Sequence, residues 1–147
     1  MKNLRRYWQI ILPIIVMLII WNFSAQNGDE SDGVSLAFAA KLDLSNGVTR
    51  KIAHFLIYSI LGLTLANFFR SLKPKKFPNL KALIFSLIIA VIYSSIDEYH
   101  QSLIPGRDGN PTDIIIDGLG TIAGICVFTA IICFIRQKKA EKRKFAK

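Results

Sequence analysis

Residues 95–120 read SIDEYHQSLIPGRDGNPTDIIIDGLG, and this polar stretch joins two long apolar runs. It holds an acidic pair, a histidine, a glutamine, a Pro-Gly-Arg turn and two spaced aspartates. Pro105 and Gly106 stop a helix and turn the chain. The stretch therefore predicts two consecutive helices whose ionisable groups gather at the ends that the turn connects.

The apolar runs on either side belong to a set of four. Hydrophobic residues make up 52% of the 147 residues, which is high for a soluble protein. Each run is close to the roughly 17–25 residues that cross a bilayer as a helix, with every backbone group bonded internally. We therefore predict an all-α, polytopic membrane protein, with one domain over residues 1–147 and a four-helix transmembrane bundle. The runs are Trp8–Phe23, Ile52–Phe69, Leu80–Ile96 and Ile114–Ile135, and the helices are expected at about 8–26, 52–69, 80–101 and 113–136.

The first run also resembles a signal peptide, because MKNLRRYW gives it a basic start. The following segment, NFSAQNG, is a poor cleavage site because Phe23 is bulky. A retained signal anchor is the interpretation that we favour.

The basic residues predict the orientation of the bundle. The net charge is +9, but the basic residues flank apolar runs instead of alternating with aromatic ones, which indicates a membrane protein and no nucleic-acid partner. Fifteen of the 19 Lys and Arg residues fall in the amino-terminal tail, the connection at 70–81 and the carboxy-terminal tail, together with one acid, Glu141. The other nine acids lie on the opposite side, in the two remaining connections and at the helix ends beside them. We therefore expect a multi-pass protein of the cell membrane with both termini in the cytoplasm.

The second predicted helix carries an ionisable group below the membrane surface. Arg50, His54, Tyr58 and Gly62 recur every four residues and so share one face. His54 lies about 6 Å deeper than Arg50, at the rise of 1.5 Å per residue in a helix. An ionisable side chain at that depth is a candidate for a functional site, although it can also be a packing histidine satisfied by a carboxylate or carbonyl.

The third and fourth predicted helices add acidic groups on the same side of the membrane. Asp97 and His100 are adjacent on a helix surface, as are Glu98 and Gln101. A carboxylate beside a histidine suits acid–base chemistry or a metal site, although an amphipathic helix end would look the same. The spacing is not that of a zinc-protease helix, so we predict no metal and no cofactor.

The fourth helix is expected to begin with Thr112 or Asp113 as its cap. Asp117 shares a side with the small residues of GTIAG, residues 120–124, and small residues allow close contact between helices. Asp117 should therefore point inward, where it needs a partner. The available partners are Arg50, Arg107 and His54.

These residues together predict one polar site at the outer leaflet. Its candidate catalytic residues are Asp97, Glu98, His100 and His54, and its candidate binding residues are Arg50, Arg107, Gln101, Asp113 and Asp117.

The chain resembles the VanZ-like family, membrane proteins named for a teicoplanin-resistance protein. The resemblance rests on FSAQ, RKIAHFLIYSILG, SSIDEYHQSLIPGR and DIIIDGLGTIAG, in this order between Phe23 and Gly124. Many relatives have Asn where this chain has Asp117. The resemblance implies a small envelope protein, linked in some members to low-level resistance to teicoplanin-type lipoglycopeptides, and it supplies no reaction.

Two kinds of function fit this site. A binding module would use Arg50 and Arg107 to hold an anionic lipid headgroup, a cell-wall precursor or a lipoglycopeptide. An enzyme would use Glu98 or Asp97 as general base, a histidine as proton shuttle and Arg107 as anion clamp, on a lipid-linked or peptidoglycan substrate. A proton-coupled transporter would need ionisable groups near the bilayer midplane, where the second and third helices are apolar.

Overall fold

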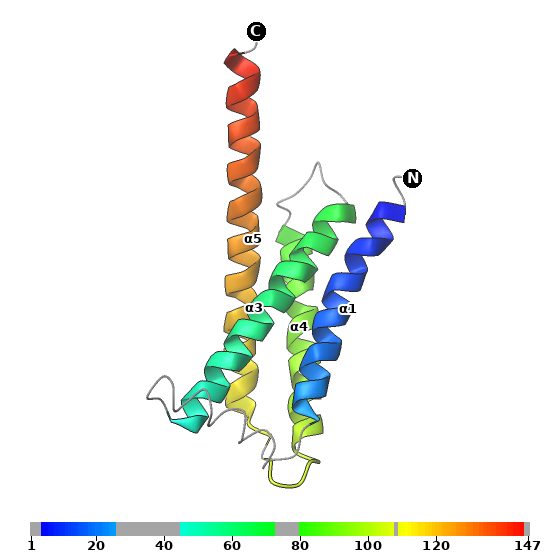
Figure 1. Ribbon diagram of the computed structural model, residues 1–147, viewed down its shortest axis with the longest axis vertical. Helices are drawn as coiled ribbons and strands as arrows, with labels where there is room; N and C mark the ends of the chain where they lie inside the picture. The colour runs from blue at the N-terminus through cyan, green and yellow to red at the C-terminus, as the bar shows by residue number, and fades with distance from the viewer. Residues whose placement is uncertain (1–3, 26–44, 73–79, 108, 146–147) are drawn as a thin grey trace.

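The computed structural model describes residues 4–25, 45–72, 80–107 and 109–145, which contain four α-helices and no strand (Figure 1). The helices are α1 (Leu4–Ser24), α3 (Asn46–Leu72), α4 (Leu80–Gln101) and α5 (Pro111–Phe145). The prediction of an all-helical bundle is confirmed.

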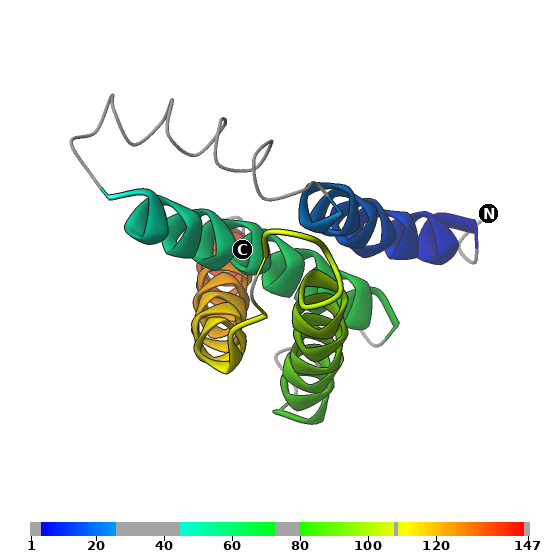
Figure 2. The same cartoon turned by 90° about the horizontal axis from the view of Figure 1, so that it is seen from below.

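Helix α3 is the centre of the bundle. It packs against each of the other three helices, and its most extensive contact is with α5. Seen along the bundle, α1 lies on one side of α3 while α4 and α5 lie on the other (Figure 2). The end of α1, the start of α3, the end of α4 and the start of α5 all lie at the lower end in Figure 1. The start of α1 and the end of α5 point to the opposite end.

The surface of the bundle is that of a membrane protein. Helices α3, α4 and α5 are long and apolar enough to cross a membrane, while the apolar part of α1, Trp8–Ser24, is shorter. Large side chains such as Leu56, Phe85, Ile92 and Phe134 are exposed on the outside, whereas polar side chains are buried between the helices. Apolar surface that faces outward around a polar interior is favourable only where the surroundings are themselves apolar.

Helices α3 and α5 extend furthest beyond the bounds expected from the sequence. Helix α3 begins at Asn46 because Ser45 caps it, with the Ser45 side-chain oxygen 3.4 Å from the backbone nitrogen of Val48. Helix α5 continues to Phe145 because the Gln, Lys, Ala, Glu and Arg residues after its apolar part favour helix. Its 35 residues make it about 52 Å long, more than the ~30 Å of a hydrocarbon core.

Three glycines bring the backbones of α3 and α5 into contact. A Cβ atom at Gly62 would lie 2.3 Å from the carbonyl oxygen of Thr121, and one at Gly120 would lie 2.4 Å from that of Phe55. At Gly124 the distance to the carbonyl oxygen of Ser59 would be 1.8 Å. The small-residue face of α5 is thus packed against α3. Asp117 and His54 lie at the end of this contact, three residues before Gly120 and one residue before Phe55.

Candidate functional site

Buried polar side chains line the inner face of α4 at the lower end of the bundle in Figure 1. Ser94, Asp97, Glu98 and Gln101 are all buried, and they follow Ser86 and Ala90 along one side of the helix. The α4 helix lies beside both α3 and α5, so this face meets the inward side chains of both neighbours. An apolar cluster that includes Tyr58, Leu61 and Ala90 lies deeper in the bundle, starting one helical turn from His54 on α3 and from Ser94 on α4.

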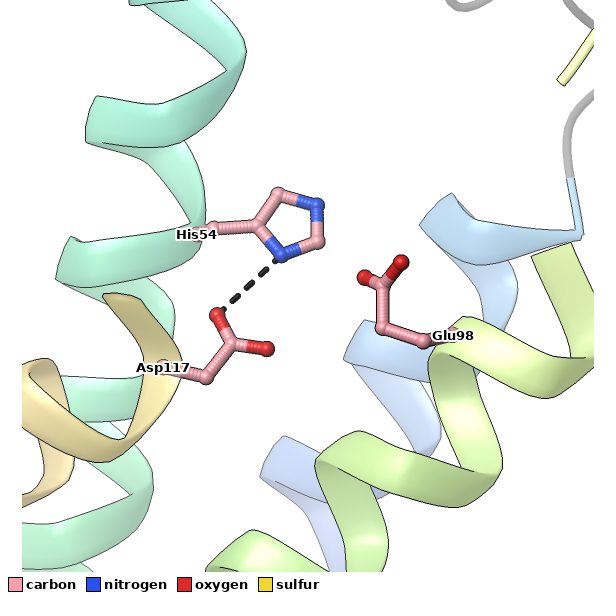
Figure 3. Close-up of side chains that lie close together, drawn as sticks. All are labelled: His54, Glu98 and Asp117. Atoms are coloured by element: carbon pink, nitrogen blue, oxygen red, sulfur yellow. Dashed lines mark hydrogen bonds and ion pairs between the residues drawn. The ribbon is translucent and has the colours of Figure 1, made fainter. Parts of the chain in front are cut away.

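Asp117 of α5 forms an ion pair with His54 of α3. The Nδ1 atom of His54 lies 3.2 Å from Oδ1 of Asp117 (Figure 3). The Asp117 side chain is fully buried, while 18% of the His54 side chain is exposed. The sequence predicted that Asp117 points inward and needs a partner, and of the three candidates the structure shows His54.

The second carboxylate oxygen of Asp117 is held by α4. The hydroxyl of Ser94 donates a hydrogen bond to Asp117 Oδ2 at 2.6 Å. Both oxygens therefore have partners, one on each neighbouring helix. This fixes the carboxylate, and through it the orientation of the His54 ring, since a histidine ring is oriented by the bond that one of its nitrogens makes.

Glu98 approaches the same pair from the opposite side. Figure 3 shows its carboxylate extending from α4 toward the His54 ring and Asp117. The backbone N–H of Asn110 donates to Glu98 Oε2 at 2.8 Å, and the side-chain amide of Gln101 approaches Glu98 Oε1 at 3.5 Å. The same Gln101 amide donates to Asp97 Oδ2 at 3.0 Å. Gln101 thus ties the two neighbouring acids of α4 together.

The turn that follows α4 is shaped to deliver the Asn110 backbone to Glu98. Gly106 has a φ of 76°, a left-handed conformation that glycine adopts without strain. A Cβ atom at Gly109 would lie 2.5 Å from the carbonyl oxygen of Glu98, so only glycine lets the returning chain come this close.

The predicted cap of α5 was wrong. The side-chain oxygen of Asn110 accepts the N–H of Thr112 at 3.1 Å, which makes Asn110 the cap and Pro111 the first helical residue. Asp113 lies half-buried in the first turn, where its charge interacts favourably with the helix dipole.

The two predicted binding arginines lie at the rim of the site. The guanidinium of Arg107 donates to the carbonyl of Ser24 at 2.8 Å and to that of Phe23 at 3.4 Å, at the end of α1. These bonds tie the turn after α4 to α1, because the last carbonyls of a helix have no partner within it. Arg50 is half-buried in the first turns of α3, one turn before His54.

His100 lies away from the other candidates. Its ring stacks on Trp21 of α1, with 4.0 Å between ring centroids. It is adjacent to Asp97 along the helix, as predicted, but Asp97 faces the interior and His100 faces α1. The structure therefore brings together His54, Asp97, Glu98, Gln101 and Asp117, and it sets His100, Arg50, Arg107 and Asp113 around them.

Two residues of the site were missed in the sequence. Ser94 lies one turn before Glu98 in a row of small residues spaced by four, and that spacing marks the inner face of α4. Asn110 precedes a proline, which is a frequent start of a helix. Both signals are present, but neither identifies the carboxylate that the residue contacts.

The arrangement suits proton transfer or cation binding. If the hydrogen of His54 lies on Nδ1, that nitrogen donates to Asp117 and Nε2 is left to exchange a proton. One nitrogen of His54 and one oxygen each of Glu98 and Asp117 also lie within 4.8 Å of one another, close enough to converge on a metal ion.

Comparison with known proteins agrees with the motifs that surround this site. Neither a curated protein nor a solved structure matches the chain. A family model described as VanZ/LLP1 matches residues 9–134, a range that includes every residue of the site. The chain therefore belongs to the VanZ/LLP1 family, the VanZ-like membrane proteins.

Proposed function

We propose that this protein spans the cell membrane four times and uses a polar site at the outer leaflet to bind, and act by proton transfer on, a cell-envelope component. Its ligand would be a lipid-linked cell-wall precursor, a peptidoglycan fragment or a lipoglycopeptide. Protection against teicoplanin-type antibiotics would follow from that activity. The observation that carries the proposal is the His54–Asp117 pair with Glu98 beside it, built from three helices at one end of the bundle.

The roles follow from exposure. His54 is the accessible member of the pair, so it would exchange the proton with the ligand, while Asp117 orients the ring and stabilises its charged form. Glu98 would accept or supply the proton on the other side. Arg50 at the rim, together with Arg107 and Asp113, would position the anionic or polar groups of the ligand.

The orientation is supported by charge and by the direction of the helices. The start of α1 and the end of α5 lie at the same end of the bundle, and both neighbouring tails are basic. Basic segments stay in the cytoplasm. The site lies at the opposite end, which faces outward in this orientation.

Single cysteines test the orientation. In a background with Cys126→Ala and Cys133→Ala, we expect Ser102→Cys to react with a membrane-impermeant maleimide in intact protoplasts. Arg143→Cys should react only after permeabilisation. Ser102 and Arg143 are both exposed in the structure, so access to the thiol depends on the side of the membrane alone. The reverse labelling pattern would place the site in the cytoplasm and contradict the proposal.

Susceptibility to two glycopeptides tests the function. A sensitive Gram-positive host would express the wild type, Glu98→Gln or Glu141→Gln at equal membrane levels, with teicoplanin and vancomycin compared. We expect the wild type to protect selectively against teicoplanin and Glu98→Gln to return to the empty-vector value, because the amide cannot accept a proton. Glu141→Gln makes the same chemical change on the exposed end of α5 and should protect like the wild type.

A binding module without catalysis is the second candidate. It is favoured by the nearly complete burial of Asp97 and Asp117, which are 1% and 0% exposed and so act through their neighbours. This candidate predicts that Glu98→Gln protects as well as the wild type, because the amide keeps the shape of the side chain. Protection by neither the wild type nor the variants would exclude the resistance role.

A further inference from the structure

We propose that His54, Glu98 and Asp117 bind a divalent transition-metal ion, such as Zn²⁺ or Mn²⁺. The inference rests on the site of the proposed function and deepens it: the ion would meet an anionic ligand, and with His54 and Glu98 as its ligands, a water on the ion would take over the proton exchange. Each residue comes from a different helix, α3, α4 and α5 (Figure 3).

The first support is the spacing of the ligand atoms. One nitrogen of His54 and one carboxylate oxygen each of Glu98 and Asp117 all lie within 4.8 Å of one another. Two ligands on opposite sides of an ion at roughly 2.1 Å are about 4.2 Å apart. The Glu98 carboxylate approaches from the opposite side of the site. Its rotation would shorten the separation of the ligand atoms from up to 4.8 Å to the distance of about 4.2 Å that an ion allows.

The second support is the balance of buried charge. Asp97, Glu98 and Asp117 are all nearly or fully buried in an interior surrounded by apolar helix surface. The described hydrogen bonds to these carboxylates come from the His54 ring, the Ser94 hydroxyl, the Gln101 amide and the Asn110 backbone. Among these donors only His54 can carry a positive charge. Buried carboxylates are costly without a cation, and a divalent ion supplies two charges at the point where they converge.

The third support is the set of groups behind the ligands. Ser94 donates to the Asp117 oxygen that does not contact His54, and the Asn110 backbone and Gln101 hold the Glu98 carboxylate. Hydrogen bonds of this kind orient the ligands of metal sites.

The donor set fits a reactive metal centre better than a structural one. A nitrogen with two carboxylate oxygens is a ligand set that zinc and manganese accept, while a structural zinc site has four protein ligands. Three protein ligands leave positions for water or for a phosphate or carboxylate of the ligand. Asp97 is close along the helix but lies outside this group, so it would act on the site through Gln101.

Metal content of the purified full-length protein tests the inference. The protein would carry a tag without histidine and the changes Cys126→Ala and Cys133→Ala, because cysteine thiols bind zinc on their own. Elemental analysis of detergent-purified protein and calorimetric titration of the chelator-treated protein with Zn²⁺ and with Mn²⁺ would be compared among the wild type, Glu98→Gln and Glu141→Gln.

We expect about one ion per chain in the wild type and in Glu141→Gln, and an affinity more than about 100-fold weaker in Glu98→Gln. X-ray absorption of the bound ion should show nitrogen and oxygen neighbours. Only the monodisperse fraction of each variant would be compared. If Glu98→Gln does not fold, the metal content and metal affinity of the wild type alone test the inference. The inference is overturned if the wild type neither retains nor takes up either ion, or if Glu98→Gln binds it equally well.

The two proposals fail separately. If the wild type binds no metal but still protects against teicoplanin through Glu98, the metal site is excluded and the proposed function stands as a metal-free acid–base site. A wild type that binds the ion through Glu98 but gives no protection would keep the metal site and remove the proposed function.

Discussion

Alanine at Gly124 is expected to destabilise the protein by about 3 kcal/mol or more, the upper part of the range for overpacked interiors. The new Cβ atom would lie 1.8 Å from the carbonyl oxygen of Ser59 and 2.7 Å from its carbonyl carbon. These are backbone atoms of α3, so no side-chain rotation relieves the overlap and the two helices must separate. Separation would also pull Asp117 away from His54, because the two residues lie on this same pair of helices at the end of their glycine contact.

A second glycine of the same helix is the matched control for this change. A Cβ atom at Gly118 would meet only a methyl group of Val91, at an ordinary 3.9 Å. Gly118→Ala should therefore be neutral, or stabilising by up to about 1 kcal/mol because alanine favours helix. The measurement is the free energy of unfolding in mixed micelles with increasing SDS, followed by far-ultraviolet circular dichroism. Equal effects of the two alanines would show that α3 and α5 are not packed through Gly124.

The helices and the inward direction of Asp117 were predictable from the sequence. Apolar runs flanked by basic residues give the helices, since length and hydropathy are local properties. The small residues of GTIAG mark the face of α5 that approaches another helix, and Asp117 shares that face. The structure adds that the neighbour is α3 and that the contact is between backbones.

The partner of each acid was not predictable, because it depends on how the helices are rotated and crossed. Arg50, Arg107 and His54 were equal candidates for Asp117, and Arg107 instead binds the carbonyls at the end of α1. His100 and Glu98 are two positions apart, about 200° around a helix, so they cannot both face the interior. Periodicity gives that difference, and only packing shows which of the two is inside.

The absence of a local motif also explains why a metal site was not predicted. Its ligands are spaced by 44 and 19 residues along the chain and come from three helices. Sequence patterns that reveal metal sites rely on two ligands within a few residues of each other. Only the assembled bundle brings His54, Glu98 and Asp117 together.

Leucine at His54 should cost about 3–5 kcal/mol of stability, the usual range when one partner of a buried ion pair is removed. Asp117 would keep its hydrogen bond from Ser94 but would lose the only described partner that can carry a positive charge. A fully buried carboxylate without such a partner is expensive, whereas leucine itself fits apolar surroundings. The loss should appear in the same SDS titration, with a chelator present so that bound metal does not contribute.

The other histidine of the chain is the matched control. His100 loses its stacking on Trp21 when it becomes leucine, which should cost no more than about 1.5 kcal/mol. The decisive measurement is the double variant His54→Leu with Asp117→Asn, in which the charge has been removed together with its partner. It should recover most of the stability that His54→Leu loses, because asparagine keeps the shape of Asp117 and can still accept from Ser94. If the double variant is instead as unstable as the sum of its two single changes, the pair is not energetically coupled. Asp117 would then be stabilised by something other than His54, and the acid–base pair at the centre of the proposed site would have to be abandoned.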